Sequence, residues 1–312
     1  MIVALSGGVG GAKLVLGLSR ILPPDELLVV CNTGDDFEHL GLSISPDLDT
    51  VMYTLAGLAN PELGWGRRDE TWSFMETTAM LGGETWFRLG DRDLAVHVER
   101  TRRLRLGESL TSVTLDLCRR LGVGPRVVPM SDDPVRTRLL TDHGWIDFQD
   151  YFVRQRCEPS VRALEFHGAA EARVQPEFLA ALTNPALSAV VVCPSNPFIS
   201  VEPILALPGV RAALAACPAP VVAVSPIIGG KAVKGPTAKI MTELGLNPSA
   251  ESVAQRYGDL LDGYVVDLAD TSEVQGIPAK VTLGQTFMRT LEDREAVARI
   301  VLSAAAKLRR RS

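Results

Sequence analysis

The chain has 312 residues, of which 46% are hydrophobic, and its 32 basic and 37 acidic residues give a net charge of −5. This length allows one large or two ordinary domains with a substantial core, and the negative charge argues against a nucleic-acid partner. No apolar run approaches the roughly 18 residues of a membrane-spanning helix, and the five cysteines lack the CxxC spacing of a thiolate metal site. We therefore expect a cytoplasmic protein that binds small molecules, without a membrane partner.

A glycine-rich loop follows the first predicted strand. Residues 2–6 are apolar, SGGVGGAK follows, and residues 12–21 have the periodicity of a helix. Glycines let backbone N–H groups approach an anion, and a helix N-terminus adds the positive end of its dipole. We predict that Gly8, Gly10 and Gly11 bind phosphate and that Lys13 adds a positive charge.

This loop departs from two familiar phosphate-binding sequences. A dinucleotide fingerprint has a third glycine where this chain has Lys13, and a Walker A loop has lysine directly after glycine and before Ser or Thr. The predicted strand 27–31 ends in Asn32 rather than in an acid that would bind a ribose. Because these departures disfavour a dinucleotide, we predict that the loop binds another phosphorylated ligand. A nicotinamide cofactor and a simple packing turn remain open as alternatives.

Four aspartates follow the second predicted strand. Asp35, Asp36, Asp47 and Asp49 lie within fifteen residues, and Ser45-Pro46 resembles the N-cap and first position of a helix. Acids in a first helical turn also occur for the dipole alone. Beside a phosphate loop, however, carboxylates suit Mg²⁺, which one or two of them hold together with phosphate oxygens. We predict Asp35, Asp36 and Asp47 as metal ligands.

The segment WFRLGDRDLAVH adds charged residues of two kinds. Asp93 and His97 are four residues apart on a predicted helix, where a surface ion pair is the simplest interpretation and a His–Asp pair alone is a poor metal site. Arg88 precedes the helix in a glycine-containing turn, from which its guanidinium can fork onto ligand oxygens. Further along, residues 136–141 and 145–154 are predicted to form a hairpin around Asp142-His143-Gly144.

Two later strand ends carry polar residues. Ser195 and Asn196 follow the strand predicted at 188–193 and suit contacts to a nucleotide base or ribose. Gly230, Lys231 and Lys234 follow the strand predicted at 220–225, and two lysines in this glycine-rich loop predict a second phosphate contact. In open α/β sheets ligands bind at the carboxyl ends of strands, so all these residues are predicted to face one crevice.

The apolar runs define the fold class. Their continuous Val, Ile and Leu content is typical of strands buried on both faces of a parallel sheet. They span residues 2–6, 27–31, 126–129, 188–193, 220–225 and 263–267. Helical periodicity recurs at 48–58, 110–121 and 297–308. We predict an α/β fold with a doubly wound, mainly parallel sheet, formed by residues 1–135 and 181–312, and a smaller α+β region with the hairpin inserted at 136–180.

Eight motifs resemble, in order and over nearly the whole chain, the 2-phospho-L-lactate transferase family of coenzyme F420 biosynthesis. They are LSGGVGGAK, NTGDD, SPDLDTVMYTLAG, LGDRDLAVH, PMSDDP, DYFVRQR, CPSNPFIS and AVSPIIGGKAVKGP. The resemblance implies a Rossmann-like sheet and transfer of a phospholactyl-type group (phospholactyl, phosphoenolpyruvyl or phosphoglyceryl) from a guanosine diphosphate ester to a hydroxy-deazariboflavin (FO). It also implies that GMP is released and that Mg²⁺ is required.

The resemblance also implies residue roles. Asp49 and Arg88 match positions that hold the deazaflavin acceptor, and the glycine loop would face the donor diphosphate. Lys13 and Mg²⁺ would neutralise charge as GMP departs. Asp49 would orient the attacking hydroxyl or accept its proton, and the sequence does not separate these two roles. It likewise does not fix the three-carbon acid of the donor, and it is compatible with a homodimer.

Two other functions are weighed. A related family of nucleotide-sugar-binding regulatory proteins shares the glycine-loop core without being catalytic, but has no need of the PDLD and GDRD motifs. An NAD-dependent dehydrogenase is disfavoured by Lys13 and Asn32.

Overall fold

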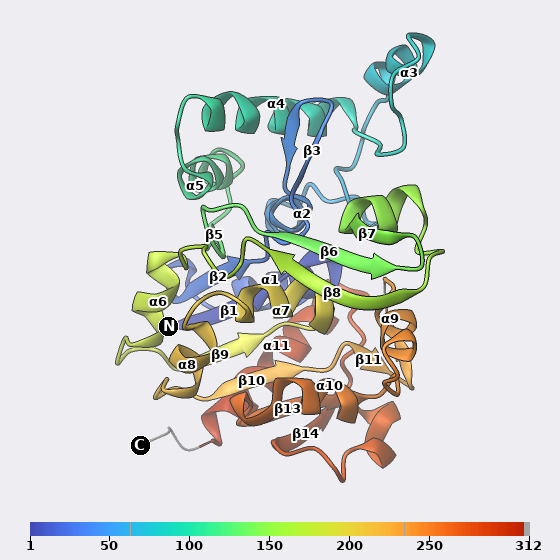
Figure 1. Ribbon diagram of the computed structural model, residues 1–312. Coiled ribbons are helices and arrows are strands. Elements are labelled where there is room, and N and C mark those ends of the chain that lie inside the picture. The colour runs from blue at the N-terminus through green and yellow to red at the C-terminus, as the bar shows by residue number, and fades with distance from the viewer. Residues whose placement is uncertain (63, 234, 309–312) are drawn as a thin grey trace.

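The computed structural model describes residues 1–62, 64–233 and 235–308. Its centre is a seven-stranded, all-parallel sheet in the order β14-β13-β10-β9-β1-β2-β5 (Figure 1). The strands are β1 (Ile2–Ser6), β2 (Leu27–Cys31), β5 (Arg126–Pro129), β9 (Ala189–Val192), β10 (Val221–Val224), β13 (Gly263–Asp267) and β14 (Lys280–Gly284). The six predicted strands are confirmed. The sequence does not predict β14, because only one residue of this edge strand is buried.

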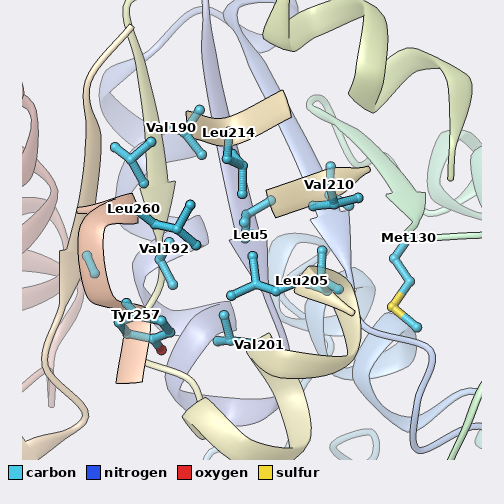
Figure 2. Close-up of a cluster of buried hydrophobic side chains, with 14 of the residues drawn as sticks. Leu5, Met130, Val190, Val192, Val201, Leu205, Val210, Leu214, Tyr257 and Leu260 are labelled. Atoms are coloured by element: carbon cyan, nitrogen blue, oxygen red, sulfur yellow. The ribbon is translucent and has the colours of Figure 1, made fainter. Parts of the chain in front are cut away.

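The central strand β1 explains why the apolar runs are continuous. Successive side chains of a strand point to opposite faces of the sheet. Val3 and Leu5 therefore join one buried cluster, whereas Ile2 and Ala4 join the other. Figure 2 shows Leu5 in the first cluster, among side chains from the helices that cover this face.

Helices cover both faces of the sheet. α1 (Gly8–Ile21), α2 (Pro46–Leu55), α5 (Leu110–Arg120) and α11 (Leu291–Ala306) contribute to the cluster with Ile2. α6 (Pro176–Leu182), α7 (Glu202–Leu205), α8 (Val210–Ala215), α9 (Thr237–Glu243) and α10 (Ala250–Tyr257) contribute to the cluster with Val3. This arrangement confirms the α/β, doubly wound fold class. Within the described residues, no helix combines the length and apolarity needed to cross a membrane.

Smaller elements surround this core. One group comprises β3 (Phe37–His39), β4 (Leu42–Ile44), α3 (Ser73–Met80) and α4 (Asp91–Arg105), drawn at the top of Figure 1. A second is the antiparallel sheet β7-β6-β8, made of β6 (Arg136–Thr141), β7 (Gly144–Asp147) and β8 (Val161–His167). The rest are the pair β11 (Ile227–Ile228) and β12 (Lys231–Ala232) and the short helical turns η1 (Pro24–Glu26), η2 (Asp150–Arg154), η3 (Pro197–Val201), η4 (Gly258–Leu260) and η5 (Leu268–Glu273).

The predicted hairpin is correct in its first half. β6 pairs with β7 in antiparallel fashion, but β7 ends at Asp147 instead of continuing to Arg154. Beyond it the chain turns helically, and the rings of Phe148 and Phe152 stack with centroids 5.3 Å apart. β8 adds a third strand that the sequence does not predict. The division into a core of residues 1–135 and 181–312 and an inserted region of 136–180 stays a prediction.

Candidate functional site

A cleft of about 640 Å³ opens at the carboxyl ends of the parallel strands. Residues directly after β1, β9 and β10 line it, as expected for an open α/β sheet. Nine of the predicted site residues lie in its wall: Gly8, Gly10, Lys13, Asp35, Asp47, Asp49, Arg88, Ser195 and Asn196. The other four, Gly11, Asp36, Gly230 and Lys231, are not among the described residues that line it.

The N-terminus of α1 forms one end of the cleft. Gly8 begins the helix with a φ of 33°, in the left-handed region that favours glycine. Its N–H donates to Oδ1 of Asp47 at 2.5 Å, so a carboxylate occupies the position where the helix dipole favours an anion. Lys13, one turn further along α1, donates from Nζ to the carbonyl oxygen of Met288 at 2.9 Å. The helix N-terminus and Lys13 therefore bring positive charge to the part of the cleft that also holds the Asp47 carboxylate.

Gly10 and Gly11 serve close packing within the chain. A Cβ on Gly10 would overlap the carbonyl oxygen of Pro194, and a Cβ on Gly11 would overlap the hydroxyls of Ser6 and Ser195. The two glycines thus let α1 approach the loop after β9. The sequence predicted that a ligand fills the space left by the absent Cβ atoms. In the structure, neighbouring backbone and hydroxyl groups fill that space.

Ser195 and Asn196 organise that loop. The hydroxyl of Ser195 accepts from the N–H of Gly7 at 3.0 Å and donates to its carbonyl oxygen at 2.9 Å. Oδ1 of Asn196 caps η3 by accepting from the N–H of Phe198 at 2.9 Å. Nδ2 of Asn196 is buried and has no hydrogen-bond partner among the described residues. It is therefore a donor that a bound ligand could satisfy.

Asp35 and Asp47 share one amide donor. Nδ2 of Asn32 donates to Asp35 and, at 2.9 Å, to Oδ2 of Asp47. Burial, with the neighbouring charges of Asp47 and Asp36, raises the pKa of Asp35 well above its usual range, and burial raises that of Asp47 to about 6. Two buried carboxylates that repel each other are suitable ligands for a hard divalent cation, which would neutralise both.

Asp36 faces a different space. Its Oδ2 accepts from the hydroxyl of Ser45 at 2.8 Å, and it lines a second cleft of about 590 Å³ together with Arg136. Burial raises the pKa of Asp36 to about 7, against the opposing charge of Arg136. Of the three predicted metal ligands, only Asp35 and Asp47 are therefore among the described residues that line the first cleft. The predicted helix start beside them is confirmed, with Ser45 at the N-cap and Pro46 at the first position.

This pKa has a consequence for stability. An unfolded aspartate titrates near its ordinary value of 3.8, so between about pH 4 and 7 the folded protein binds more protons at Asp36 than the unfolded chain does. Its contribution to stability is full below about pH 4 and is lost as the pH rises to 7. Between about pH 4 and 7, the free energy of unfolding of the wild type should therefore decrease with pH. In the presence of chelator, Asp36→Asn should make this slope shallower by up to about 1.4 kcal/mol per pH unit.

Denaturant unfolding at several pH values measures this effect. Asp69→Asn is the control, because the Asp69 side chain is 73% exposed. Equal slopes for wild type and Asp36→Asn would show that Asp36 does not titrate in this range.

Asp49 belongs to a buried network beside the cleft, two residues along α2 from Asp47. Its two oxygens accept from the two Nη atoms of Arg100, one at 3.0 Å. His97 lies between Asp49, with Nδ1 at 3.7 Å, and Asp93, with Nε2 at 3.2 Å. The hydroxyl of Tyr53 donates to Asp93 at 2.6 Å. The expected pairing of Asp93 with His97 is therefore confirmed, but its expected surface position is wrong, because α4 packs this face inward and leaves the two residues 9% and 2% exposed.

Asp49, Asp93 and His97 form a possible metal-binding group. One ligand atom from each lies within 4.8 Å of the others. The sequence analysis judged Asp93 and His97 alone to be a poor metal site, and the structure adds Asp49 from α2 to them. Hydrogen bonds from Arg100 and Tyr53 already engage both carboxylates. This makes the group a less suitable cation site than Asp35 and Asp47, which no arginine of the described residues pairs with in this way.

Arg88 lies at the rim of the cleft. Its guanidinium stacks over the Trp72 ring, with the central carbon 4.0 Å from the ring centroid. Two reciprocal contacts hold this segment in place, since Glu70 accepts from the first N–H groups of α4 and Asp91 accepts from those of α3. The fork of Arg88 is thereby oriented on a fixed turn.

Aromatic side chains form a wall that the sequence analysis did not identify. Besides Tyr53, the cleft is lined by Trp65, Trp86, Phe87, Phe148, Phe152 and Phe287. Flat apolar side chains of this kind suit a planar ring system. The available signal was the Trp content of residues 60–105, but these rings come from segments far apart in the chain.

Gly230 lies at the turn between β11 and β12, and Lys231 is the first residue of β12, whereas Lys234 lies outside the described residues. The N–H groups of Gly229 and Gly230 donate to the two oxygens of Asp270, at 3.0 and 2.9 Å. The backbone donors that would have met a phosphate are therefore engaged by a carboxylate. The side chain of Lys231 is exposed.

Comparison with known proteins gives consistent results. A family model described as 2-phospho-L-lactate transferase CofD matches residues 2–289. The chain is 44% identical to a phosphoenolpyruvate transferase of Kitasatospora aureofaciens, covering 98% of this chain and 97% of the relative. It is 39% identical to a 2-phospho-L-lactate transferase of Methanosarcina mazei, covering 97% and 99%. A crystal structure of a UPF0052 family member from Bacillus halodurans has a TM-score of 0.66 at 13% identity, covering 96% and 98%, which shows similarity of fold.

Proposed function

The chain belongs to the 2-phospho-L-lactate transferase CofD family, and we propose that its 640 Å³ cleft binds both substrates of the family reaction side by side. It is a transferase of coenzyme F420 biosynthesis that moves a phospholactyl- or phosphoenolpyruvyl-type group onto FO. One observation carries the proposal for the cleft. The N-terminus of α1 with Lys13, and the aromatic side chains with Asp49 and Arg88, line one cavity. The proposal places the donor at the first group, called the α1 end, and the acceptor at the second, called the aromatic end.

The reaction requires alignment and charge neutralisation. The ribityl hydroxyl oxygen of FO forms a bond to phosphorus while the bond from phosphorus to the departing GMP breaks, and the hydroxyl proton is released. Little covalent chemistry is asked of the protein. Its task is to hold the acceptor oxygen in line and to stabilise the charge that develops on GMP.

The donor diphosphate is assigned to the end at α1. Lys13 and the positive end of the α1 dipole supply charge, and Ser195 and Asn196 lie beside them for the nucleoside, with the buried Nδ2 of Asn196 as a donor. Asp35 and Asp47 are the residues we propose to hold Mg²⁺, which when bound would neutralise the diphosphate. Lys231 remains a candidate for a second phosphate contact through its side chain alone.

The acceptor is assigned to the aromatic end. The deazaflavin ring would lie against the aromatic wall, with Arg88 at the rim and Asp49 at the reacting hydroxyl. An NAD-dependent dehydrogenase would instead bind NAD in place of GDP, and a regulatory binding protein would turn over neither substrate. Release of GMP that depends on FO distinguishes all three functions.

We further propose that the donor carries enolpyruvate. The relative named phosphoenolpyruvate transferase is 44% identical to this chain, against 39% for the one named 2-phospho-L-lactate transferase. The test is a competition between the enolpyruvyl and lactyl esters of guanosine diphosphate, read as the ratio of their kcat/KM values. A ratio favouring lactate would overturn this assignment and leave the transferase function intact.

Arg88→Ala tests the acceptor end. Loss of a charge-assisted hydrogen bond costs about 1.5–3 kcal/mol, so the Kd for FO should rise roughly 10- to 100-fold. The Kd for GDP should stay unchanged, because GDP binds at the other end. The shift of the deazaflavin spectrum on titration measures FO binding. Arg68→Ala is the matched control, because Arg68 pairs with Asp69 and is not among the described residues of the cleft wall. Parallel losses for FO and GDP would contradict separate sites.

A further inference from the structure

Arg100 is a fully buried arginine that lies behind the wall of the cleft. It belongs to α4, is 1% exposed, and is absent from the described residues of the cleft wall, whereas its partner Asp49 is one of them. Both Nη atoms donate to Asp49, one to each carboxylate oxygen. Pairing at two points fixes the position of a carboxylate and also its rotation.

Further contacts keep Arg100 in place. Its Nη1 lies 3.2 Å from Nδ1 of His97, and His97 in turn lies against Asp93. The hydroxyl of Tyr53 reaches Asp93 from α2, the same helix that carries Asp49. Asp36 also attracts the guanidinium from a greater distance. These groups connect α2 to α4 twice, so the Asp49 carboxylate has little freedom to turn.

We propose that Arg100 is a positioning residue for the transfer reaction, holding the Asp49 carboxylate in the orientation in which it accepts a hydrogen bond from the attacking hydroxyl of the acceptor. Each oxygen of Asp49 receives one N–H from Arg100 and retains a second lone pair for a ligand in the cleft. Arg100 acts through Asp49 and touches no substrate. The inference rests on the proposed function, in which Asp49 contacts the acceptor.

A double-mutant cycle tests this role. Arg100→Lys keeps the positive charge but loses the fork that binds both oxygens. It should lower kcat by about 10- to 100-fold, because small misplacements of an orienting group slow an aligned displacement strongly. The KM for the donor and the Kd for GDP should stay within about twofold. In an Asp49→Asn background the same substitution should change kcat by less than about twofold, since the group it positions is already altered.

Controls separate positioning from folding. Arg103→Lys is the matched variant on the same helix, because Arg103 pairs with Glu108 and Asp116 and is not a described residue of the cleft wall. It should keep wild-type kcat. If Arg100→Lys does not fold, Arg100→Gln combined with Asp49→Asn replaces the ion pair by two neutral amides, and its kcat should equal that of Asp49→Asn alone.

Three outcomes would overturn the inference. The first is a folded Arg100→Lys with wild-type kcat. The second is an equal loss of kcat in both Asp49 backgrounds, or a further loss in the double amide variant, which would give Arg100 a role independent of Asp49. The third is wild-type protein that releases no GMP when FO is added. That result overturns the proposed function as well, and it is seen before any variant is made.

Discussion

Asp47→Asn should reduce transfer at saturating substrates by at least about 100-fold, the range seen when one preorganised electrostatic group is removed from an active site. Asp47 shares Asn32 with Asp35 and accepts from the first amide of α1, so its charge lies where a metal and a diphosphate would meet. An asparagine can still accept the hydrogen bond from Gly8, which should preserve the start of the helix. Chelator should likewise abolish transfer by the wild type, and added Mg²⁺ should restore it.

The measurement is GMP release against Mg²⁺ concentration, with urea unfolding to verify the fold. Asp36→Asn is the comparison, because it makes the same change from carboxylate to amide at a residue of the neighbouring cleft. A loss as large as that of Asp47→Asn would return Asp36 to the ligand set. Full turnover in chelator would remove the metal from the mechanism.

Lys13→Ala should lower kcat by about 100- to 1,000-fold while the Kd for GDP rises less than about tenfold. A cation beside the diphosphate stabilises the charge on departing GMP more than it stabilises the bound donor. Single-turnover mixing with FO measures the chemical step, and GDP titration measures binding.

Lys13→Arg is the matched variant for the charge. It should recover part of the loss in kcat, because a guanidinium keeps the cation although its shape differs. Equal losses in kcat and GDP affinity for Lys13→Ala would show that Lys13 contributes uniform binding only.

The motifs identified some of the residues at the acceptor end and missed others. Asp49 and Arg88 line one cleft, and they stand out in the sequence because Asp49 belongs to the PDLD motif and Arg88 directly precedes LGDRDLAVH. Arg100 did not stand out in the same way, and His97 stood out only as a partner of Asp93 on the helix surface. Arg100 reads as one of several charges on a helix, and its pairing with Asp49 joins residues 51 positions apart.

The glycine loop shows a different limit. The sequence predicted a tight approach of backbone at Gly10 and Gly11, and this approach occurs, but to Pro194 and Ser195. A missing Cβ indicates that space is scarce at a position. It does not indicate whether a ligand or another part of the chain takes that space.

The sequence alone determined the parallel sheet and the start of α2. Both depend on residues that are neighbours along the chain: strands buried on two faces need continuous apolar runs, and a helix start needs Ser45 and Pro46 in succession. The tertiary structure alone decided that Asp36 faces a second cleft, that His97 is buried and that Arg100 holds Asp49. The physical reason is that burial and ion pairing act through space, between helices whose relative placement no local pattern encodes.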